Sequence, residues 1–479
     1  MLNAFDTELL VIGAGPAGLA AATTAAALGI DTVLMDEQAA PGGQIYRALS
    51  TSPLPRPQIL GQDYLAGQTL IDDFMAGTAR YQPNAMVWSI TPFTHALGQQ
   101  GFHAVWSEQG TARRLRARHI LLATGAQERP VPLPGWTLPG VMMAGAAQIA
   151  LKTSGLVPDQ NVVLAGSGPL LYLLAWQYQQ AGAPVTAVLD TTPPGRWATA
   201  LDDCWDFLRS PYFRKGLALV RQVRAHTRVI HGVTGLQALG NEAVNAVRYS
   251  AGGHTYTIDT PLLLLHQGVI PNINLPQAAG ATLRWNTAQA CWEPACDPWG
   301  QSNVTGLHIA GDGAGIAGAQ VAAERGRLAA LDAAMQLGRI TMASRNAKAA
   351  ASRRALARAM RGRRFLDTYF RPADAFRYPA DDTVVCRCEE ISAQDICRAV
   401  ALGCTGPNQL KAFLRCGMGP CQGRFCDVTV TELVARERGI SPDEAGHYRR
   451  RFPTKPVTLG ELASLPTNDA ARAVVQRSP

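Results

Sequence analysis

The sequence predicts an α/β protein with two Rossmann-like dinucleotide-binding domains and a small helical domain at its carboxyl end. Two stretches, 7–36 and 160–190, each have the pattern of an apolar strand, a glycine-rich turn, a helix and a second strand. A third stretch, 384–437, holds seven of the ten cysteines. The 479 residues are enough for about three domains, at roughly 150 residues each.

The composition is that of an ordinary globular protein with an unevenly distributed charge. Hydrophobic residues make up 47% and charged residues 17%, and the formal net charge is +8. Basic residues concentrate at 345–371, where Asp367 is the only acid. We expect a solvated, alanine-rich helix leading into a linker there, with contact to an acidic partner or a membrane surface as the alternative. The stretch carries no nucleic-acid-binding motif, so we expect no nucleic-acid partner.

The amino-terminal segment shows no basic region typical of a signal peptide. Its uncharged stretch, 9–30, is explained by the glycine motif described next, so we expect no transmembrane segment. The expected location is the cytoplasm, with peripheral contact to the inner face of the membrane left open. Thiols stay reduced there, so ten cysteines favour metal or redox chemistry over disulfides.

The first stretch contains a dinucleotide-binding motif in its expected context. An apolar strand at 9–12 is followed by Gly13, Gly15 and Gly18 in the spacing G-x-G-x-x-G, and a helix follows. These glycines allow a tight turn, approach of a pyrophosphate to the backbone and close packing of helix on strand. Asp36 ends the next strand, where a carboxylate bonds a ribose hydroxyl.

Three further segments point to FAD. They are PGGQIY at 41–46, a strand ending in Ala-Thr-Gly within 117–130, and a strand ending in Gly311-Asp312 within 304–327. Together with the first motif, residues 5–335 resemble the flavoproteins of the disulfide-reductase type, in which one nucleotide-binding domain is nested within another. The resemblance implies that Asp312 bonds the ribityl chain of FAD. The FAD contacts it implies are Gly13, Gly15, Pro16, Ala17, Gly18, Asp36, Glu37, Gly43, Gln44, Val87, Thr124, Gly125, Gly311, Asp312 and Gln320.

The second stretch is similar to the nested nicotinamide domain of the same proteins. Gly166 and Gly168 match the motif, Leu171 replaces its third glycine, and Asp190 ends the following strand. NAD, another adenine nucleotide and a vestigial site are all open here. Because no arginine cluster follows Asp190, NADP is disfavoured.

The flavin domain shows no catalytic dithiol. A C-x-x-C pair is absent from the whole sequence, and Cys204, Cys291 and Cys296 are expected to be thiols without a catalytic role. A general base does not stand out either, so the sequence assigns no catalytic residue to this chain.

The cysteine-rich end predicts an iron–sulfur cluster. Cys386 and Cys388 form C-x-C, and after thirty-two residues Cys421 and Cys426 form C-x₄-C. Four thiolates from two loops suit a [2Fe–2S] cluster, and tetrahedral zinc is the alternative. Cys416 is expected to lie outside the ligand set, although its spacing keeps it a candidate. Cys397 and Cys404 are also expected to be non-ligands.

The segment 384–437 resembles the small helical domain of bacterioferritin-associated ferredoxin, in the C-Q-G-x-x-C version that is fused to flavin dehydrogenases. Ser392 and Asp395 predict a capping box for a helix that ends near Gly403. The predicted domains are 1–150 and 286–340 (FAD), 151–285 (nested), 341–380 (basic linker) and 381–479 (cluster domain and tail).

The combination of both parts resembles the FAD-containing A or α subunits of heteromeric opine oxidases, hydrogen cyanide synthase and (hydroxy)proline dehydrogenases. The resemblance implies an electron-transfer subunit. Its partner would be a D-amino-acid-oxidase-like flavoprotein β subunit, its acceptor a quinone or similar carrier, and a small third subunit is left open. Two alternatives are a stand-alone NAD(P)H-dependent FAD/[2Fe–2S] reductase and a non-enzymatic scaffold subunit.

Overall fold

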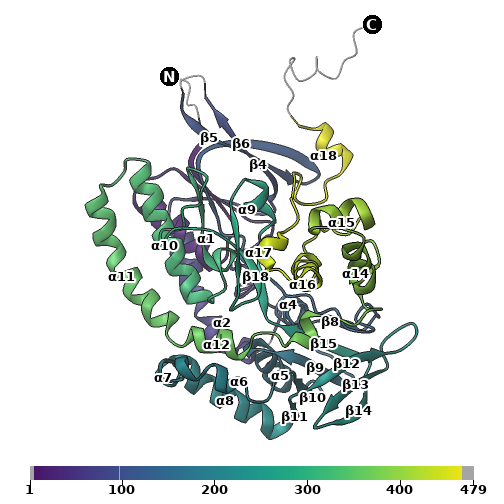
Figure 1. The fold of residues 1–479 in the computed structure, drawn as a ribbon. Helices are drawn as coiled ribbons and strands as arrows, with labels where there is room; N and C mark the ends of the chain where they lie inside the picture. The colour runs from purple at the N-terminus through teal and green to yellow at the C-terminus, as the bar shows by residue number, and fades with distance from the viewer. Residues whose placement is uncertain (1–4, 55, 96–97, 466–479) are drawn as a thin grey trace.

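The computed structural model describes residues 5–465 apart from 55 and 96–97. Two sheet-centred units are built from the first part of the chain, and the C-terminal helices pack beside them (Figure 1). This arrangement confirms the predicted fold class. We call residues 5–340 the flavoprotein body and residues 381–465 the C-terminal domain.

The first sheet is mostly parallel and has an antiparallel extension, in the order β3-β2-β1-β6-β5-β4, with β19 pairing β6. Its strands are β1 (Thr7–Ile12), β2 (Thr32–Met35), β3 (Arg80–Gln82), β4 (Met86–Thr94), β5 (Gln100–Glu108), β6 (Thr111–Leu122) and β19 (Leu307–Ile309). Helices α1 (Pro16–Ala27) and α10 (Ala319–Gln336) pack against each other, while α2 (Gln62–Leu65) and α3 (Gly67–Met75) follow β2 along the chain.

The last four residues of β1, Leu9 to Ile12, are all apolar because the sheet is covered on both faces. Leu9 and Val11 pack into the core that contains α1 and α10, and Leu10 and Ile12 pack into the core on the opposite face. Side chains alternate along a strand, so both sets must be apolar. The predicted strand, turn, helix and second strand are therefore confirmed.

The second sheet is fully parallel, in the order β11-β10-β9-β15-β8. Its strands are β8 (Val141–Met143), β9 (Val162–Ser167), β10 (Val185–Asp190), β11 (Arg228–His231) and β15 (Leu262–Gln267). A separate antiparallel sheet consists of β12 (Thr234–Leu239), β13 (Ala246–Ala251) and β14 (His254–Asp259). The helices of this unit are α4 (Ala144–Ser154), α5 (Pro169–Ala181), α6 (Arg196–Thr199), α7 (Cys204–Leu208) and α8 (Pro211–His226).

The chain enters this unit from the first sheet and returns to it, as expected for a nested domain. Two short strands, β7 (Ala126–Glu128) and β16 (Val269–Pro271), pair where the chain leaves and returns. The return segment continues through α9 (Asn274–Ala278) and the hairpin of β17 (Leu283–Asn286) and β18 (Cys291–Pro294) before β19.

The basic segment differs from the expected solvated helix. It forms α11 (Met342–Met360), α12 (Arg363–Tyr369) and α13 (Asp374–Arg377), and α11 packs along α10. Arg345 donates to Asp332 Oδ1 at 2.5 Å, and its guanidinium lies 3.9 Å from the Trp299 ring centroid. One face of α11 is thus buried. Its arginine stacks on an aromatic ring of the body and pairs with a carboxylate there.

The C-terminal domain has the helices that the sequence predicts. Its elements are β20 (Val384–Cys386), β21 (Ile391–Ser392), α14 (Ala393–Ala401), α15 (Pro407–Leu414), α16 (Asp427–Arg438), α17 (Pro442–Ala445) and α18 (Leu459–Ala463). The Ser392–Asp395 capping box is present, and Gly439 ends α16 in the left-handed conformation. Within the described part of the chain, every helix is too short or too polar to cross a membrane.

Candidate functional site: two nucleotide folds and a cysteine cluster

Two of the three glycines in the motif at the start of α1 leave no room for a Cβ. Gly13 has φ +106°, and a Cβ there would lie 2.3 Å from the carbonyl oxygen of Ala123. A Cβ on Gly18 would lie 1.8 Å from the carbonyl oxygen of Gly13. Helix α1 begins after Gly15, and no side chain of the described residues caps it. Its first N–H groups therefore stay available to a pyrophosphate, as FAD requires.

The other predicted FAD segments converge on this turn. A Cβ on Gly43 would lie 2.7 Å from Gly15 Cα, and one on Gly311 would lie 2.8 Å from Ala17 Cβ. A Cβ on Gly313 would lie 3.3 Å from Gly125 N. The motif, PGGQIY, Ala-Thr-Gly and Gly-Asp segments thus surround one cradle, which supports FAD as the cofactor.

The predicted side chains differ in how they are engaged. Asp36 is buried at the end of β2 and accepts from Ala14 N at 2.5 Å and Gln38 N at 2.8 Å, while Glu37 pairs with Lys455 of the C-terminal domain. Asp312 accepts from the backbone N–H groups that lead into α10. Most of the remaining predicted contacts lie on the segments around this turn: Pro16 and Ala17 in α1, Gln44 in the PGGQIY loop, Thr124 after β6 and Gln320 at the start of α10. Val87 lies on β4 of the same sheet.

Sequence reasoning missed Lys152, which holds the PGGQIY loop. Its Nζ donates to the carbonyl oxygens of Gln44 and Ile45 at 3.2 and 2.9 Å. Burial lowers the pKa of Lys152 to about 7. A single lysine in a helix carries no motif, and the contact joins segments more than a hundred residues apart, so the sequence offers no signal for it.

The second nucleotide fold has its glycine turn, but its ribose acid is already engaged. Helix α5 starts after Gly168, whose φ is +117°, and Leu171 is buried where the motif has a glycine. Asp190 Oδ2 accepts from the Tyr172 hydroxyl at 2.5 Å and lies 3.2 Å from His231 Nδ1.

The other oxygen of that carboxylate is engaged as well. Asp190 Oδ1 accepts from Thr192 N at 2.9 Å. On the other side of the turn, a Cβ on Gly166 would lie 1.6 Å from the carbonyl oxygen of His266. The turn therefore keeps the backbone shape of a nucleotide fold, but Asp190 already has three hydrogen-bond partners where Asp36 has two.

Five cysteines gather at one end of the C-terminal domain, in two groups. The Sγ atoms of Cys386, Cys416 and Cys426 lie within 4.8 Å of one another, and all three residues are buried. Cys388 and Cys421 form an outer pair with 3.7 Å between their Sγ atoms. All four predicted ligands are thus at this end, and Cys416, which was expected to lie outside the ligand set, is in the buried group.

The buried group favours a thiolate at Cys386. Hydrogen bonds from Cys416 and Cys426 lower the pKa of Cys386 to about 2, and the backbone N–H groups of Gly417 and Glu389 add to the effect. A thiolate is the form that binds iron or zinc. The outer pair is held close because position 419 is glycine: a Cβ there would lie 2.2 Å from Cys388 Cβ. The donor set fits a Cys-ligated cluster.

The remaining cysteines have other surroundings. Burial raises the pKa of Cys291 and of Cys296 to about 12, so both stay as inert thiols. Cys404 is buried and lies 3.4 Å from the carbonyl oxygen of Gly406. Cys397 is half-buried on α14, and Cys204 begins α7. No disulfide forms in the described part of the chain.

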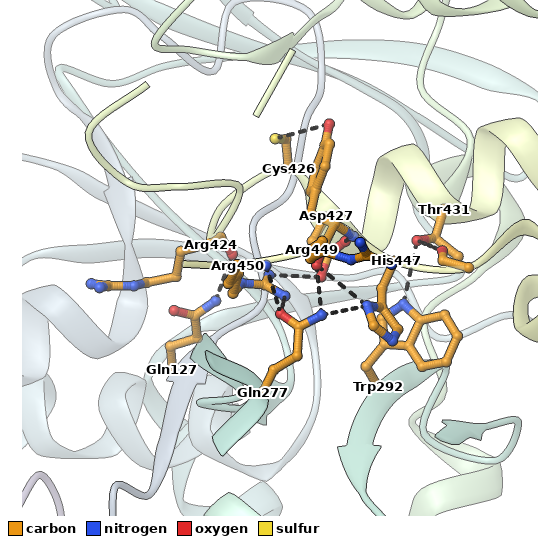
Figure 2. Close-up of polar contacts among 12 residues, drawn as sticks. Gln127, Gln277, Trp292, Arg424, Cys426, Asp427, Thr431, His447, Arg449 and Arg450 are labelled. Atoms are coloured by element: carbon orange, nitrogen blue, oxygen red, sulfur yellow. Dashed lines mark hydrogen bonds and ion pairs between the residues drawn. The ribbon is translucent and has the colours of Figure 1, made fainter. Parts of the chain in front are cut away.

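Residues 415–426, here called the cysteine loop, lie directly on the flavoprotein body. Gln127 of β7 donates to the carbonyl oxygen of Arg424 at 2.7 Å, between Cys421 and Cys426 (Figure 2). Gln127 follows the Thr124–Gly125 turn of the FAD cradle by two residues. The cradle and the cysteine loop are thus joined through one hydrogen bond and a few residues of backbone.

A second set of contacts fixes the same interface. Gln277 of the body lies 2.6 Å from His447 Nδ1 (Figure 2). It also donates to the Tyr448 carbonyl at 2.7 Å. Arg450 pairs with Asp427 at 2.7 Å, and both side chains are almost inaccessible to solvent. A cavity of about 10 Å³, lined on its polar side by Gln127, Arg424, Asp427 and Arg450, is large enough for about one water molecule.

Two family descriptions match the chain. Residues 7–326 match the pyridine nucleotide-disulphide oxidoreductases, and residues 381–465 match the sarcosine oxidase A3 domain. The first match covers the two sheet-centred units, and the second covers the C-terminal domain with its cysteines.

Relatives with known names cover nearly the whole chain. The A subunit of opine oxidase from Agrobacterium tumefaciens is 48% identical over 98% of this chain and 94% of its own length. The HcnB subunit of hydrogen cyanide synthase from Pseudomonas aeruginosa is 32% identical over 96% and 98%. Among solved structures, L-proline dehydrogenase from P. horikoshii superposes with a TM-score of 0.67 at 18% identity, over 95% of this chain and 79% of that chain. This last likeness concerns the fold.

Proposed function

Because the chain belongs to the family of the opine oxidase A subunits, and through residues 7–326 to the pyridine nucleotide-disulphide oxidoreductases, it is an oxidoreductase of the flavoprotein class. On that premise we propose that it is the electron-transfer subunit of a heteromeric FAD-dependent dehydrogenase. The substrate would be an opine, a proline-type imino acid or a glycine-type amino acid, oxidised at its C–N bond.

In this proposal the oxidation of substrate takes place on a second, D-amino-acid-oxidase-like flavoprotein subunit. The relatives that carry a subunit name support an assembly of several chains. A small third subunit would complete some assemblies. The final acceptor would be a quinone or a similar carrier, so that an otherwise cytoplasmic complex would touch the inner face of the membrane.

One observation carries the proposal: the cysteine loop packs on the strand that leaves the FAD cradle. The Gln127–Arg424 hydrogen bond links the two directly, and the buried Asp427–Arg450 pair keeps the loop in place. Electron transfer needs its two centres to be close and rigidly held, and a scaffold subunit would not need the cysteines at this position.

The residues of this chain would hold two redox groups and adjust their potentials. FAD and a [2Fe–2S] cluster, when bound, supply two-electron and one-electron chemistry, respectively. The glycine turn and Asp312 would position FAD, and the uncapped N-terminus of α1 would bind its phosphates. Cys386, Cys388, Cys421 and Cys426 would ligate the cluster.

The experiment is an anaerobic reductive titration of the purified chain, with iron and acid-labile sulfide determined on the same sample. We expect FAD, two irons and two sulfides per chain. We also expect a rhombic EPR signal that appears with dithionite and not with NADH. A chain with zinc in place of iron and sulfide, or without metal, would refute the proposal and favour a scaffold.

The response to NADH distinguishes the proposed electron-transfer subunit from a stand-alone NAD(P)H-dependent reductase. If NADH reduces the flavin, the chain is a stand-alone reductase and the proposal fails. The engagement of both Asp190 oxygens by Tyr172, His231 and Thr192 argues for the inert outcome. As a matched pair, Cys421→Ser should abolish the EPR signal, and Cys397→Ser in the same domain should preserve it.

A further inference from the structure

A tyrosine hydroxyl points into the buried cysteine group. Tyr448 is fully buried, and its hydroxyl donates to Cys416 Sγ at 3.2 Å. Cys426 Sγ lies 3.8 Å from the same oxygen. A phenol is protonated at neutral pH, so this hydroxyl is a hydrogen-bond donor.

Two glycines and two backbone hydrogen bonds hold the Tyr448 ring in this position. Gly417 and Gly423 both have left-handed φ angles, and a Cβ on either would lie 2.5 Å from a Tyr448 ring atom. The backbone of Tyr448 is fixed at both ends: its N–H donates to Asp427 Oδ1 at 3.3 Å and its carbonyl accepts from Gln277. Two of the three glycines in the cysteine loop thus make room for the tyrosine.

Cys416 lies beside two predicted ligands and is the nearer of the two sulfurs that the hydroxyl contacts. It is inaccessible to solvent, and its Sγ lies within 4.8 Å of those of Cys386 and Cys426. Five cysteines are present where a [2Fe–2S] cluster takes four. Cys388 and Cys421 already form a close outer pair, so the fifth thiol is an extra donor on the buried side.

We infer that Tyr448 and Cys416 form a hydrogen-bond relay that sets the reduction potential of the cluster; this rests on the proposed function. Tyr448 O–H donates to Cys416 Sγ, and the Cys416 thiol donates onward to the sulfur of Cys386. Donors to ligand sulfurs stabilise the reduced cluster, which carries one more negative charge, and so raise its potential. Both are positioning residues and not ligands.

The test is a redox titration monitored by EPR on the full chain, with iron content measured in parallel. In Tyr448→Phe, we expect full iron content and a lower midpoint potential. The equilibrium constant for one-electron reduction should fall by up to about tenfold, which is about 59 mV. Cys416→Ala should likewise keep its iron and shift in the same direction. The double variant should shift no further than Cys416→Ala, because the relay acts in series.

Matched controls are Tyr378→Phe, a half-buried tyrosine that packs against the core of the C-terminal domain, and Cys404→Ala, a buried cysteine outside the group. Both should keep the wild-type potential. Loss of iron in Cys416→Ala would overturn the inference by making Cys416 a ligand, as would unchanged potentials or additive shifts. These results require a cluster in the wild-type chain; if the wild type lacks one, the proposed function itself fails.

Discussion

Single buried polar groups do much of the positioning in this molecule. Lys152 sits in an apolar helix face of α4, with its ammonium on two carbonyl oxygens of the PGGQIY loop. Burial disfavours the charged form, and this lowers the pKa of Lys152 to about 7. The residue therefore titrates in the physiological range, although it is an ordinary lysine in the sequence.

We expect the titration of Lys152 to appear in the pH dependence of stability. From about pH 7 to pH 10.5 the unfolded chain binds a proton at this lysine and the folded chain does not. The free energy of unfolding should therefore rise with pH across this window, by up to about 1.4 kcal/mol per unit. Urea unfolding at a series of pH values should show a flatter profile for Lys152→Met than for the wild type.

The control for Lys152 is Lys348→Met, which removes an exposed lysine of α11. Its pH profile should be parallel to that of the wild type. If Lys152→Met and the wild type give parallel profiles, Lys152 does not change its protonation on folding and the argument from burial is wrong.

The sequence predicts residues whose role is set by the local backbone and misses residues whose role is set by distant neighbours. Gly13 and Gly18 were identified because the turn itself excludes a Cβ. Tyr448 could not be assigned, because its partner Cys416 lies in a separate loop thirty-two positions away. Lys152 was missed for the same reason.

At the scale of elements, the helices with local stop and start signals were predicted well. The box of Ser392 and Asp395 starts α14, and Gly439 ends α16. Helix α11 was predicted as a helix, but not its buried face: its sequence is basic and alanine-rich, and only Trp299 and Asp332 on other elements give Arg345 a buried partner. Packing of this kind depends on tertiary contacts, and the hydrophobic periodicity of the helix sequence does not predict them.

The capping box of α14 provides a test at this scale. Ser392→Ala should lower the free energy of unfolding by about 1 kcal/mol at pH 7, because the Asp395 N–H loses its acceptor. The hydrogen bond from the Ser392 side chain lowers the pKa of Asp395, so its contribution is present above about pH 3.8 and is lost as the pH falls further. The difference between variant and wild type should narrow in acid.

Urea unfolding at pH 7 and at pH 3 measures both effects. Ser154→Ala, at the exposed end of α4, is the control and should change stability by less than about 0.5 kcal/mol. An equal loss for Ser392→Ala and Ser154→Ala would show that the box adds nothing beyond an ordinary surface serine.

At the scale of the whole molecule, the interface between the flavoprotein body and the C-terminal domain brings the two predicted cofactor sites together. Both sites were predicted from separate motifs, but their contact was not, because Gln127 and Gln277 carry no motif. The interface contains a buried ion pair, Arg450–Asp427, and a second one, Arg377–Glu432, lies nearby between α13 and α16. Such pairs add little net stability, because the cost of removing both charges from water offsets their attraction.

Removing one partner of the Arg450–Asp427 pair should lower the free energy of unfolding far more than replacing both partners. Arg450→Met leaves the Asp427 carboxylate buried without its partner, and we expect a loss of about 3–5 kcal/mol in the free energy of unfolding. The double variant Arg450→Met/Asp427→Asn removes that buried charge and should recover most of the loss. The control is Arg80→Met, which breaks the exposed pair with Asp31 and should cost no more than about 1 kcal/mol. The measurement is urea unfolding of the wild type and these three variants. A double variant as unstable as Arg450→Met would contradict the argument. It would mean that the arginine stabilises the interface through its hydrogen bond to Gln277 and not through the carboxylate.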